Sequence, residues 1–410
     1  MDEIFVAIDV GSSKTAVVIA ENTDCGPVAR GFGVSHSEGV VRGIVVNIEK
    51  SEQGILRALT MAEKQAQLKV KQLWTAFGGN QTKVFKSHGV ANIPRERGIV
   101  NPTDVARLIE AAKSVPLPQN TQIIDFAVND LIVDGRHGII DPVGMTASRL
   151  EGDVLILVSQ MAPVSNLMRA FEDTGIIPIG VCASPIAAAQ AMLTDEEKES
   201  GCVLIDIGSN TTDAIMFKNN RPQIVVTIPY AGESVTHDLM VGLKLPRDKA
   251  EEVKQNHGCA VEKAVPVRAS VKIMGIEGSE QHTVKKRFIA MIMQARLEEI
   301  FSLIRSNIDE GGWKLDNETI PSGAVIVGGS SQIPDLAALG RQVFNMPVRI
   351  GLPGDTNPVT EDMNTTEYHV AWGAILIAEY RQKNKDKIEL EHRKITALWN
   401  KIKLWVLKKL

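Results

Sequence analysis

The stretch that decides the fold is a repeat: residues 8–15, IDVGSSKT, recur as residues 205–212, IDIGSNTT. An apolar, β-forming run precedes each copy, at 4–8 and 202–205, and another follows, at 16–20 and 214–217. Each copy therefore predicts a hairpin of two strands joined by a tight glycine turn. The simplest account of the two copies is a pair of related α/β domains that face each other across a shared cleft.

The residues of the two turns suit a phosphate site. Turns of Gly, Ser and Thr expose backbone N–H groups and hydroxyls to an anion without a large side chain in the way. Asp9 and Asp206 would repel a phosphate directly, so their presence favours a Mg²⁺ ion that they hold through water. Lys14 would add a positive charge on the phosphates. The alternative is two ordinary structural hairpins, but the paired copies favour a nucleotide clamp.

A third motif supports the clamp. Residues 324–334, AVIVGGSSQIP, predict a buried strand, a Gly-Gly turn and the start of a helix. Backbone can approach a flat base or a ribose closely at such a turn. Taken alone, the motif is also compatible with an ordinary loop.

These three motifs, in this order, resemble the actin-like ATPase superfamily. Finer matches resemble one of its families, FtsA, whose members act in bacterial cell division; they are DPVGM at 141–145 with RL at 149–150, PYAG at 229–232, AEEVK at 250–254, HGCA at 257–260 and VRIG at 348–351. The resemblance implies an α/β, actin-like two-domain fold with a nucleotide cleft between the duplicated domains. It also implies an inserted small αβ subdomain and a C-terminal amphipathic helix.

The resemblance assigns ligands and roles, with ATP and Mg²⁺ in the cleft and no catalytic side chain. The first phosphate loop would comprise Asp9, Gly11, Ser12, Ser13 and Lys14. The second would comprise Asp206, Gly208 and Thr211, with Thr212 beside them. The adenosine would lie against Gly328, Gly329 and Ser330, and its ribose would be held by Glu251 and Lys254. Outside the family, an i,i+3 pair such as Glu251 and Lys254 is usually a surface ion pair.

Two departures from the superfamily pattern concern the chemistry. Ser209 and Asn210 stand where most relatives have Gly-Gly, and Asn tolerates a left-handed turn. Many relatives carry an acid, which orients the attacking water, at the position of Ser184 in SPIAAA, residues 184–189. Losing such a base costs about 10²–10⁴ in rate. We therefore expect nucleotide binding with slow or absent hydrolysis.

The domain ranges that follow from the resemblance cover the whole chain. We expect an N-terminal actin-like domain at 1–81 and 164–195, interrupted by the inserted subdomain at 82–163. The second actin-like domain would span 196–231 and 316–380, with a mostly helical outer lobe at 232–315. A charged linker at 381–393 would lead to the terminal helix at 394–410.

The C-terminal stretch predicts a helix lying in a membrane interface. On a helix, one apolar stripe would comprise Ile395, Leu398, Trp399, Ile402, Trp405 and Val406, with Lys401 and Lys408 opposite. Residues 381–410 carry a net charge of +7, which leaves −11 for the rest of the chain. A basic tail suits an anionic membrane surface. The alternative is a helix that packs on the protein's own core or on a partner.

A partner surface is implied on the outer lobe. Arg296 and Glu299 match family positions linked to docking the C-terminal peptide of FtsZ, although an ordinary surface salt bridge is equally compatible. The resemblance thus implies a filament-forming adaptor that tethers the FtsZ ring to the cytoplasmic face of the inner membrane, at the division septum. It would also recruit later division proteins. The alternative is a small-molecule kinase of the sugar-kinase type; an actin-like chaperone would need a further domain after residue 380.

Composition, charge and motif content disfavour several other classes of protein. The chain has 410 residues, 44% of them apolar and 23% charged, as in an ordinary globular protein of several domains. A body of net charge −11 argues against general nucleic-acid binding. The four cysteines and eight histidines form no C-x-x-C or H-E-x-x-H motif, which disfavours zinc and disulfides. The N-terminus lacks a signal-peptide pattern, and we expect a protein that is cytosolic or bound to a membrane from the cytosolic side.

Overall fold

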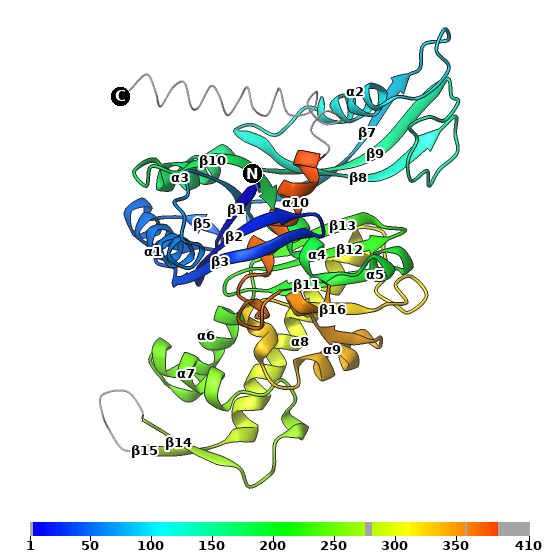
Figure 1. Cartoon of the computed structure of the whole chain (residues 1–410). Helices are drawn as coiled ribbons and strands as arrows, with labels where there is room; N and C mark the ends of the chain where they lie inside the picture. The colour runs from blue at the N-terminus through cyan, green and yellow to red at the C-terminus, as the bar shows by residue number, and fades with distance from the viewer. Residues whose placement is uncertain (1–2, 275–280, 357–358, 384–410) are drawn as a thin grey trace.

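The computed structural model describes residues 3–274, 281–356 and 359–383. Two five-stranded sheets of matching design form the body (Figure 1). The first has the order β10-β6-β1-β2-β3, with β1 Ile4–Val10, β2 Lys14–Thr23, β3 Gly26–His36, β6 Gln72–Phe77 and β10 Ile177–Ala183. The predicted hairpin at 8–15 is confirmed, because β1 and β2 pair antiparallel with Asp9 opposite Ala16.

The second sheet repeats this plan in the order β13-β12-β11-β16-β17. Its strands are β11 Cys202–Ile207, β12 Thr212–Lys218, β13 Arg221–Ile228, β16 Ala324–Val327 and β17 Val348–Ile350. Strands β11 and β12 form the second predicted hairpin, with Asp206 opposite Asp213. In both sheets the first strand of the hairpin also pairs in parallel with a strand that is followed by Gly-Gly. That strand is β6 in the first sheet and β16 in the second.

Successive side chains of a strand point to opposite faces of the sheet, and this alternation determines which helices cover each face. In β1, Val6 and Ile8 pack into a core with α1 Ile48–Ala66 and α3 Met161–Glu172. Phe5 and Ala7 face the other way, into a core with α4 Ser184–Met192 and α10 His369–Lys383. Leu204 of β11 belongs to that same core. Helices α4 and α10 therefore form a layer shared by the two sheets.

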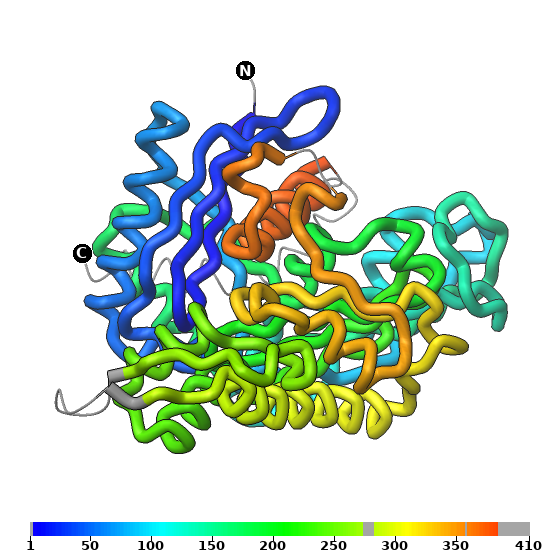
Figure 2. Tube along the Cα trace, turned by 90° about the horizontal axis from the view of Figure 1, so that it is seen from below, coloured from blue at the N-terminus to red at the C-terminus, as the bar shows by residue number. Residues whose placement is uncertain are grey.

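The insert lies within the range 82–163 and projects to one side of the body (Figure 2). A three-stranded sheet of order β7-β9-β8 comprises β7 Lys83–Asn92, β8 Thr121–Val133 and β9 Arg149–Gln160. Helix α2, Pro102–Lys113, covers one face. It begins at the sequence NPTD, residues 101–104, which is typical of a helix start, and Asn101 and Asp104 form a reciprocal cap there.

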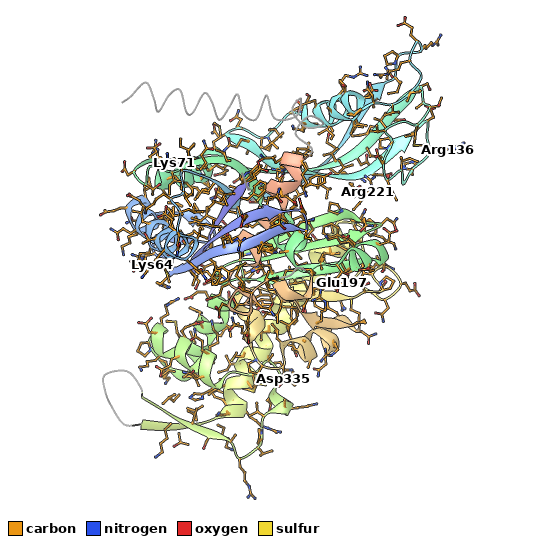
Figure 3. The ribbon with its side chains drawn as sticks, viewed as in Figure 1. Lys64, Lys71, Arg136, Glu197, Arg221 and Asp335 are labelled. Carbon is orange, nitrogen blue, oxygen red and sulfur yellow. The ribbon has the colours of Figure 1, made fainter. Side chains whose placement is uncertain are left out.

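The apolar runs at 123–128 and 154–159 predict strands, and β8 and β9 extend beyond these runs at both ends. Strand β8 contains two bulges, where Ile124 and Asn129 are extra residues that break the alternation. At the second bulge the Asn129 side chain reaches strand β13, where its amide donates to the Pro222 carbonyl at 2.8 Å. Arg221 lies at the same junction and donates to the Ile139 carbonyl of the insert (Figure 3).

The outer lobe, predicted at 232–315 as mostly helical, contains α6 Gly232–Leu243, α7 Arg247–His257 and α8 Lys286–Glu310. It also contains a hairpin that the sequence interpretation missed, β14 Ser270–Met274 paired antiparallel with β15 Gln281–Lys285. Val271 and Val284, opposite each other in it, are β-branched residues that favour strands.

Shorter elements complete the described chain. They are β4 Val40–Val41, β5 Ile44–Val45, α5 Asp195–Ser200, α9 Leu336–Phe344 and single turns of 3₁₀ helix at Glu262–Ala264, Gly329–Gln332, Pro353–Asp355 and Glu361–Met363. The predicted amphipathic helix at 394–410, and most of the linker before it, lie outside the described residues. In the stretches that the structure does describe, no helix combines the length and apolar character needed to cross a bilayer.

Candidate functional site: the cleft between the two hairpins

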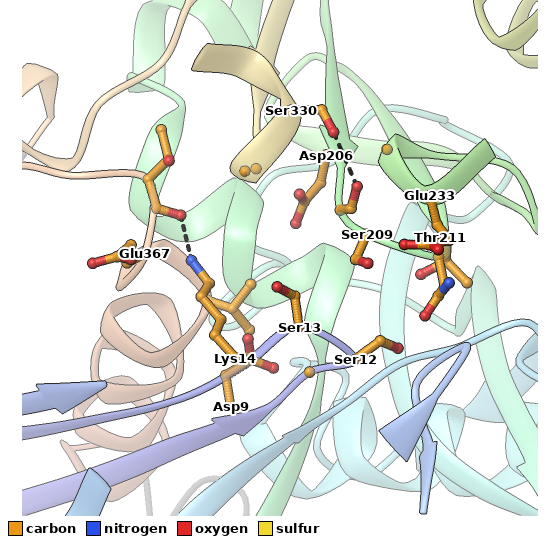
Figure 4. A pocket seen from close by; sticks show the side chains of 18 of the residues that line it. Asp9, Ser12, Ser13, Lys14, Asp206, Ser209, Thr211, Glu233, Ser330 and Glu367 are labelled. Carbon is orange, nitrogen blue, oxygen red and sulfur yellow. Dashed lines mark hydrogen bonds between the residues drawn. The ribbon is translucent and has the colours of Figure 1, made fainter. Parts of the chain in front are cut away.

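A cavity of about 770 Å³ opens between the two sheets, where both hairpin turns and both Gly-Gly turns meet (Figure 4). Thirteen of the fourteen residues predicted to hold the nucleotide line it: Asp9, Gly11, Ser12, Ser13, Lys14, Asp206, Gly208, Thr211, Glu251, Lys254, Gly328, Gly329 and Ser330. Thr212 does not line it, because its side chain is buried and its hydroxyl donates to the Tyr230 carbonyl at 2.7 Å.

The two turns have the same backbone geometry. The Gly11 N–H donates to the Lys14 carbonyl at 2.9 Å, and the Gly208 N–H donates to the Thr211 carbonyl at 3.1 Å. A Cβ at either glycine would lie 3.0 or 3.1 Å from that carbonyl, closer than is comfortable. Small residues therefore keep both turns tight and leave their outer face to a ligand.

Asp9 and Lys14 form the charged floor of the first turn. Burial raises the pKa of Asp9 to about 6, against the opposing effects of Lys14 and His369. Burial lowers the pKa of Lys14 from its usual value. The Lys14 ammonium donates to the Thr366 carbonyl at 2.8 Å, as the dashed line in Figure 4 marks. A cation bound beside Asp9, or a polyanion bound beside Lys14, would offset the free-energy cost of burying these charges.

Asp206, in the second turn, has a different neighbour. Its Oδ2 lies 2.8 Å from Nε2 of His369, a residue that the sequence interpretation did not single out. Burial alone would raise the pKa of Asp206, but the imidazole outweighs it and holds the pKa below its ordinary value. The two residues are 163 positions apart. No local pattern could have indicated their contact.

Asp213 is a further acid of the cleft that the sequence interpretation missed. It follows the second repeat directly, lines the cavity and lies opposite Asp206 in the strand register. Burial raises its pKa to about 7, although the Thr227 hydroxyl donates to it at 2.5 Å. The adjacent acid after TT, where the first repeat has Ala16, was the signal available in the sequence.

Glu251 and Lys254 do more than form a surface ion pair. Their charged atoms lie 2.7 Å apart, with the Lys254 side chain 12% exposed. The Thr236 hydroxyl donates to Glu251 at 2.6 Å, and Lys254 donates to the Gly232 carbonyl at 3.1 Å. The pair thus joins α7 to the start of α6 and presents a carboxylate to the cavity.

Gly-Gly turns close the cavity on both sides. Gly328 has φ +87°, and a Cβ there would lie 2.3 Å from Oδ1 of Asp206. A Cβ at Gly329, by contrast, would meet no atom within 4 Å, so this glycine is open to a ligand. The first sheet has the counterpart Gly78-Gly79, which the sequence interpretation missed although it also lines the cavity.

These residues fit a magnesium–nucleotide. Two carboxylates and one ammonium meet at turns rich in free N–H groups, beside a glycine wall with room for a flat base. Among the described residues, no group of three or more His, Cys, Asp and Glu side chains is placed to hold a metal ion directly. Asp9 and Asp206 would hold Mg²⁺ through water, and the ion would neutralise phosphate charge there.

The residues predicted to dock a partner lie on the outer lobe, away from the cavity. Arg296 donates to Asp238 of α6 from two nitrogens, at 2.6 and 2.9 Å, and to Glu299 at 2.5 Å. The same two helices carry exposed apolar residues, Val241 on α6 and Met291 on α8, which are 66% and 46% exposed. The residues predicted to reach the membrane, Ile395 to Lys408, lie outside the described part of the chain.

Two family models match the chain. The model described as "Cell division protein FtsA" matches residues 203–373, and the model described as "SHS2 domain inserted in FTSA" matches residues 79–158. The second match covers the sheet β7-β9-β8 with helix α2. The expected inserted αβ subdomain is therefore confirmed.

Curated relatives match over almost the whole chain. The cell division protein FtsA of Borreliella burgdorferi is 32% identical over 99% of this chain and 98% of its own length. The FtsA protein of Pseudomonas aeruginosa is 29% identical over 93% and 90%, and that of Escherichia coli K12 is 26% identical over 98% and 96%.

Solved structures confirm the actin-like fold. A "PilM-PilN type IV pilus biogenesis complex" matches with a TM-score of 0.65, 16% identity and coverage of 91% of this chain and 98% of that one. MreB 5 of Spiroplasma citri bound to AMPPNP matches with a TM-score of 0.54, 14% identity and coverage of 94% and 98%. At such identities the likeness concerns the fold alone.

Proposed function

The chain belongs to the FtsA family of cell-division proteins, and from this premise we propose that it is an ATP-binding, filament-forming adaptor. It tethers the FtsZ ring to the cytoplasmic face of the inner membrane at the septum and helps to recruit later division proteins. The observation that carries the proposal is the cleft, in which thirteen predicted residues from four separate segments line one cavity.

In this proposal the cleft binds ATP with Mg²⁺. The turn after β1 and the turn after β11 hold the phosphates, with Lys14 as the cation among them. Glu251 accepts hydrogen bonds from the ribose, and Gly329 leaves room for the base. The MreB 5 structure contains AMPPNP, which is consistent with this use of the fold.

The nucleotide acts mainly as a ligand in this proposal, and hydrolysis is slow. Ser184, at the start of α4, lines the cavity at the position where an acid would orient water. A serine hydroxyl does not accept a proton at neutral pH, so the base is missing. Bound ATP then shifts the equilibrium between closed and open forms and so controls assembly.

The outer lobe binds the C-terminal peptide of FtsZ in this proposal. Arg296 is held by Asp238 and Glu299, so its guanidinium is oriented before a partner arrives. The exposed Val241 and Met291 supply apolar surface on the same two helices, α6 and α8. An acidic and apolar peptide would match both features.

The C-terminal stretch attaches the protein to an anionic membrane in this proposal. Lysines near an anionic surface contribute about 1 kcal/mol each. Apolar residues such as Trp399 and Trp405 add burial energy, which the cost of ordering the helix largely offsets. A filament that carries many tails gains avidity, so membrane attachment and self-assembly support each other.

The test is vesicle co-sedimentation of the full chain with Mg-ATP and a labelled FtsZ-tail peptide, on phosphatidylglycerol-containing vesicles. The wild-type chain should carry the peptide into the pellet. Trp399→Glu with Trp405→Glu should leave the protein in the supernatant with its peptide affinity intact, whereas Arg296→Glu should pellet without peptide. Lys314→Glu, an equal charge change on an exposed residue, is the control. Pelleting of the peptide by the Arg296 variant would contradict the docking proposal.

A further inference from the structure

The segment at the start of α10 is contacted by residues from three separate segments that line the cleft. The Thr366 carbonyl accepts from Lys14 of the first turn at 2.8 Å, and the Thr366 hydroxyl lies 3.0 Å from the amide of Gln332. His369 contacts Asp206 of the second turn at 2.8 Å. Thr366 and His369 are each 3% exposed. We call residues 366–369 the α10 bridge.

The α10 bridge joins the two halves of the molecule. Helix α10 packs with the first half, where a Cβ on Gly373 would lie 1.7 Å from the Ala187 carbonyl of α4. So close an approach means that the two helices are tightly packed at this point. Asp206, in contrast, lies near the end of strand β11, and Gln332 follows strand β16, both in the second sheet. The contacts of the bridge therefore cross the cleft.

The hydrogen bonds of His369 determine how it holds Asp206. Nδ1 lies 3.0 Å from the Thr366 carbonyl, which can only accept, so Nδ1 donates to it. Nε2 lies 2.8 Å from Oδ2 of Asp206, and a carboxylate oxygen also accepts, so Nε2 donates to it. The other oxygen of Asp206, Oδ1, packs against Gly328, where an added Cβ would lie 2.3 Å away. Both carboxylate oxygens therefore have a neighbour within the protein.

The same atoms are those that a magnesium–nucleotide would use. Asp206 is one of the two carboxylates that we assign to Mg²⁺, and Lys14 is the cation that we assign to the phosphates. The carboxylates and cations around the bridge are Asp9, Lys14, Asp206 and Glu367. A nucleotide bound in the cleft thus shares Asp206 and Lys14 with the bridge.

We propose that the α10 bridge competes with magnesium–nucleotide for Asp206 and Lys14, and that His369 is the positioning residue that holds Asp206. The inference rests on the proposed nucleotide site and adds a regulatory contact to it. Its consequence is directional: strengthening the bridge weakens magnesium-dependent nucleotide binding, and nucleotide binding loosens the tie between α10 and the second sheet.

The test measures how much Mg²⁺ the full chain needs for half-maximal binding of a fluorescent ATP analogue. His369→Ala should lower that concentration about threefold to tenfold, because a hydrogen bond to a charged group is removed from the competition. His369→Gln, which keeps a donor for Asp206, should stay nearer to wild type. His88→Ala is the matched control, since its imidazole lies 2.9 Å from Asp153 in the insert and neither residue lines the cavity.

A second readout does not depend on nucleotide. In buffer with neither Mg²⁺ nor nucleotide, His369→Ala should speed amide hydrogen exchange in residues 203–212 and in the first turn of α10. Added Mg-ATP should make wild-type exchange in α10 approach that of the variant. If His369→Ala fails to fold, Gln332→Ala removes another arm of the bridge from an exposed residue and should move both readouts in the same direction, by less.

The outcomes separate this inference from the nucleotide site itself. If the wild-type chain binds no nucleotide, the proposed function fails, and the competition fails with it. If the wild type binds while the His369 variant needs the same Mg²⁺ concentration or more, only the competition is overturned. Unchanged amide exchange in the variant would overturn the role of His369 as a positioning residue.

Discussion

The two halves of the molecule have the same strand order and differ in the residues at equivalent positions. Strands β1, β2, β3, β6 and β10 correspond in order to β11, β12, β13, β16 and β17. Thr15 and Thr212 are equivalent in the repeat, and both are buried. Lys14 corresponds to Thr211, and Ala16 to Asp213. Burial preserves the strand positions of Thr15 and Thr212, while positions that line the cleft, such as Lys14 and Asp213, differ between the halves.

The halves also differ in where each carries its extra structure. The first half is interrupted between β6 and β10 by the insert, and the second between β13 and β16 by the outer lobe. An aspartate–arginine pair ties the insert to helix α10, and the lobe contains a comparable pair between its own helices α6 and α8. The insert uses Asp125 with Arg381, and the lobe uses Asp238 with Arg296. The first pair is the more deeply buried, which makes the comparison testable.

The largest effect should come from breaking the buried pair. The Asp125 side chain is 1% exposed, accepts from Arg381 at 2.6 Å and accepts from the Ala183 N–H at 2.9 Å. Asp125→Ala leaves these donors buried and should lower the free energy of unfolding by about 3–5 kcal/mol. Asp238→Ala, in the more exposed pair, should cost about 1 kcal/mol. Urea denaturation of both variants measures the difference; equal losses would refute the contrast.

The next effect concerns Asp213, where the first half has Ala16. The folded-state pKa of Asp213 is about 7, above its ordinary 3.8. The folded chain therefore binds the proton more tightly, and stability falls as pH rises from about 4 to 7. Asp213→Asn mimics the protonated form and should stabilise the protein at pH 8 by about 2–4 kcal/mol, with no gain at pH 4. Denaturation curves across that range test this, and a pH-independent difference would contradict it.

The third prediction compares the equivalent turn residues Lys14 and Thr211. Lys14→Ala removes the only cation in the IDVGSSKT turn and should weaken Mg-ATP binding by about 1.5–3 kcal/mol, roughly 10- to 100-fold. Thr211→Ala removes a neutral hydroxyl and should cost about 1 kcal/mol at most. Calorimetric titration of both variants gives the two affinities. A larger loss for Thr211→Ala would reverse the roles assigned to the turns.

The smallest effect distinguishes the two glycines of one turn. Gly328→Ala places a Cβ 2.3 Å from Asp206 at a φ of +87°, and should destabilise the fold by about 1–3 kcal/mol. Gly329→Ala meets no atom within 4 Å, so its melting temperature should match wild type. If Gly329 borders the base, its variant should instead lower nucleotide affinity. Equal melting temperatures for the two variants would argue against strain at Gly328.

Much of the fold was predictable because its signals are local. The amphipathic pattern of residues 49–67 predicts a helix, and α1 spans Ile48–Ala66; the run 72–77 predicts a strand, and β6 spans Gln72–Phe77. A hydrophobic period and a capping residue report on neighbours a few positions away, and these neighbours form the helix or strand. The β14–β15 hairpin escaped prediction because its short strands lie in a region otherwise dominated by helices.

By itself, the sequence determined the duplicated hairpins, the phosphate-type turns and the membership of an actin-like family. Repeated motifs are visible in the chain without knowledge of its packing. Only the tertiary structure decided that His369 holds Asp206, that Thr366 accepts from Lys14 and that Arg381 meets Asp125. Each of these contacts joins residues more than 160 positions apart. Such pairs are brought together by the packing of sheets and helices, which leaves no periodic trace in the sequence.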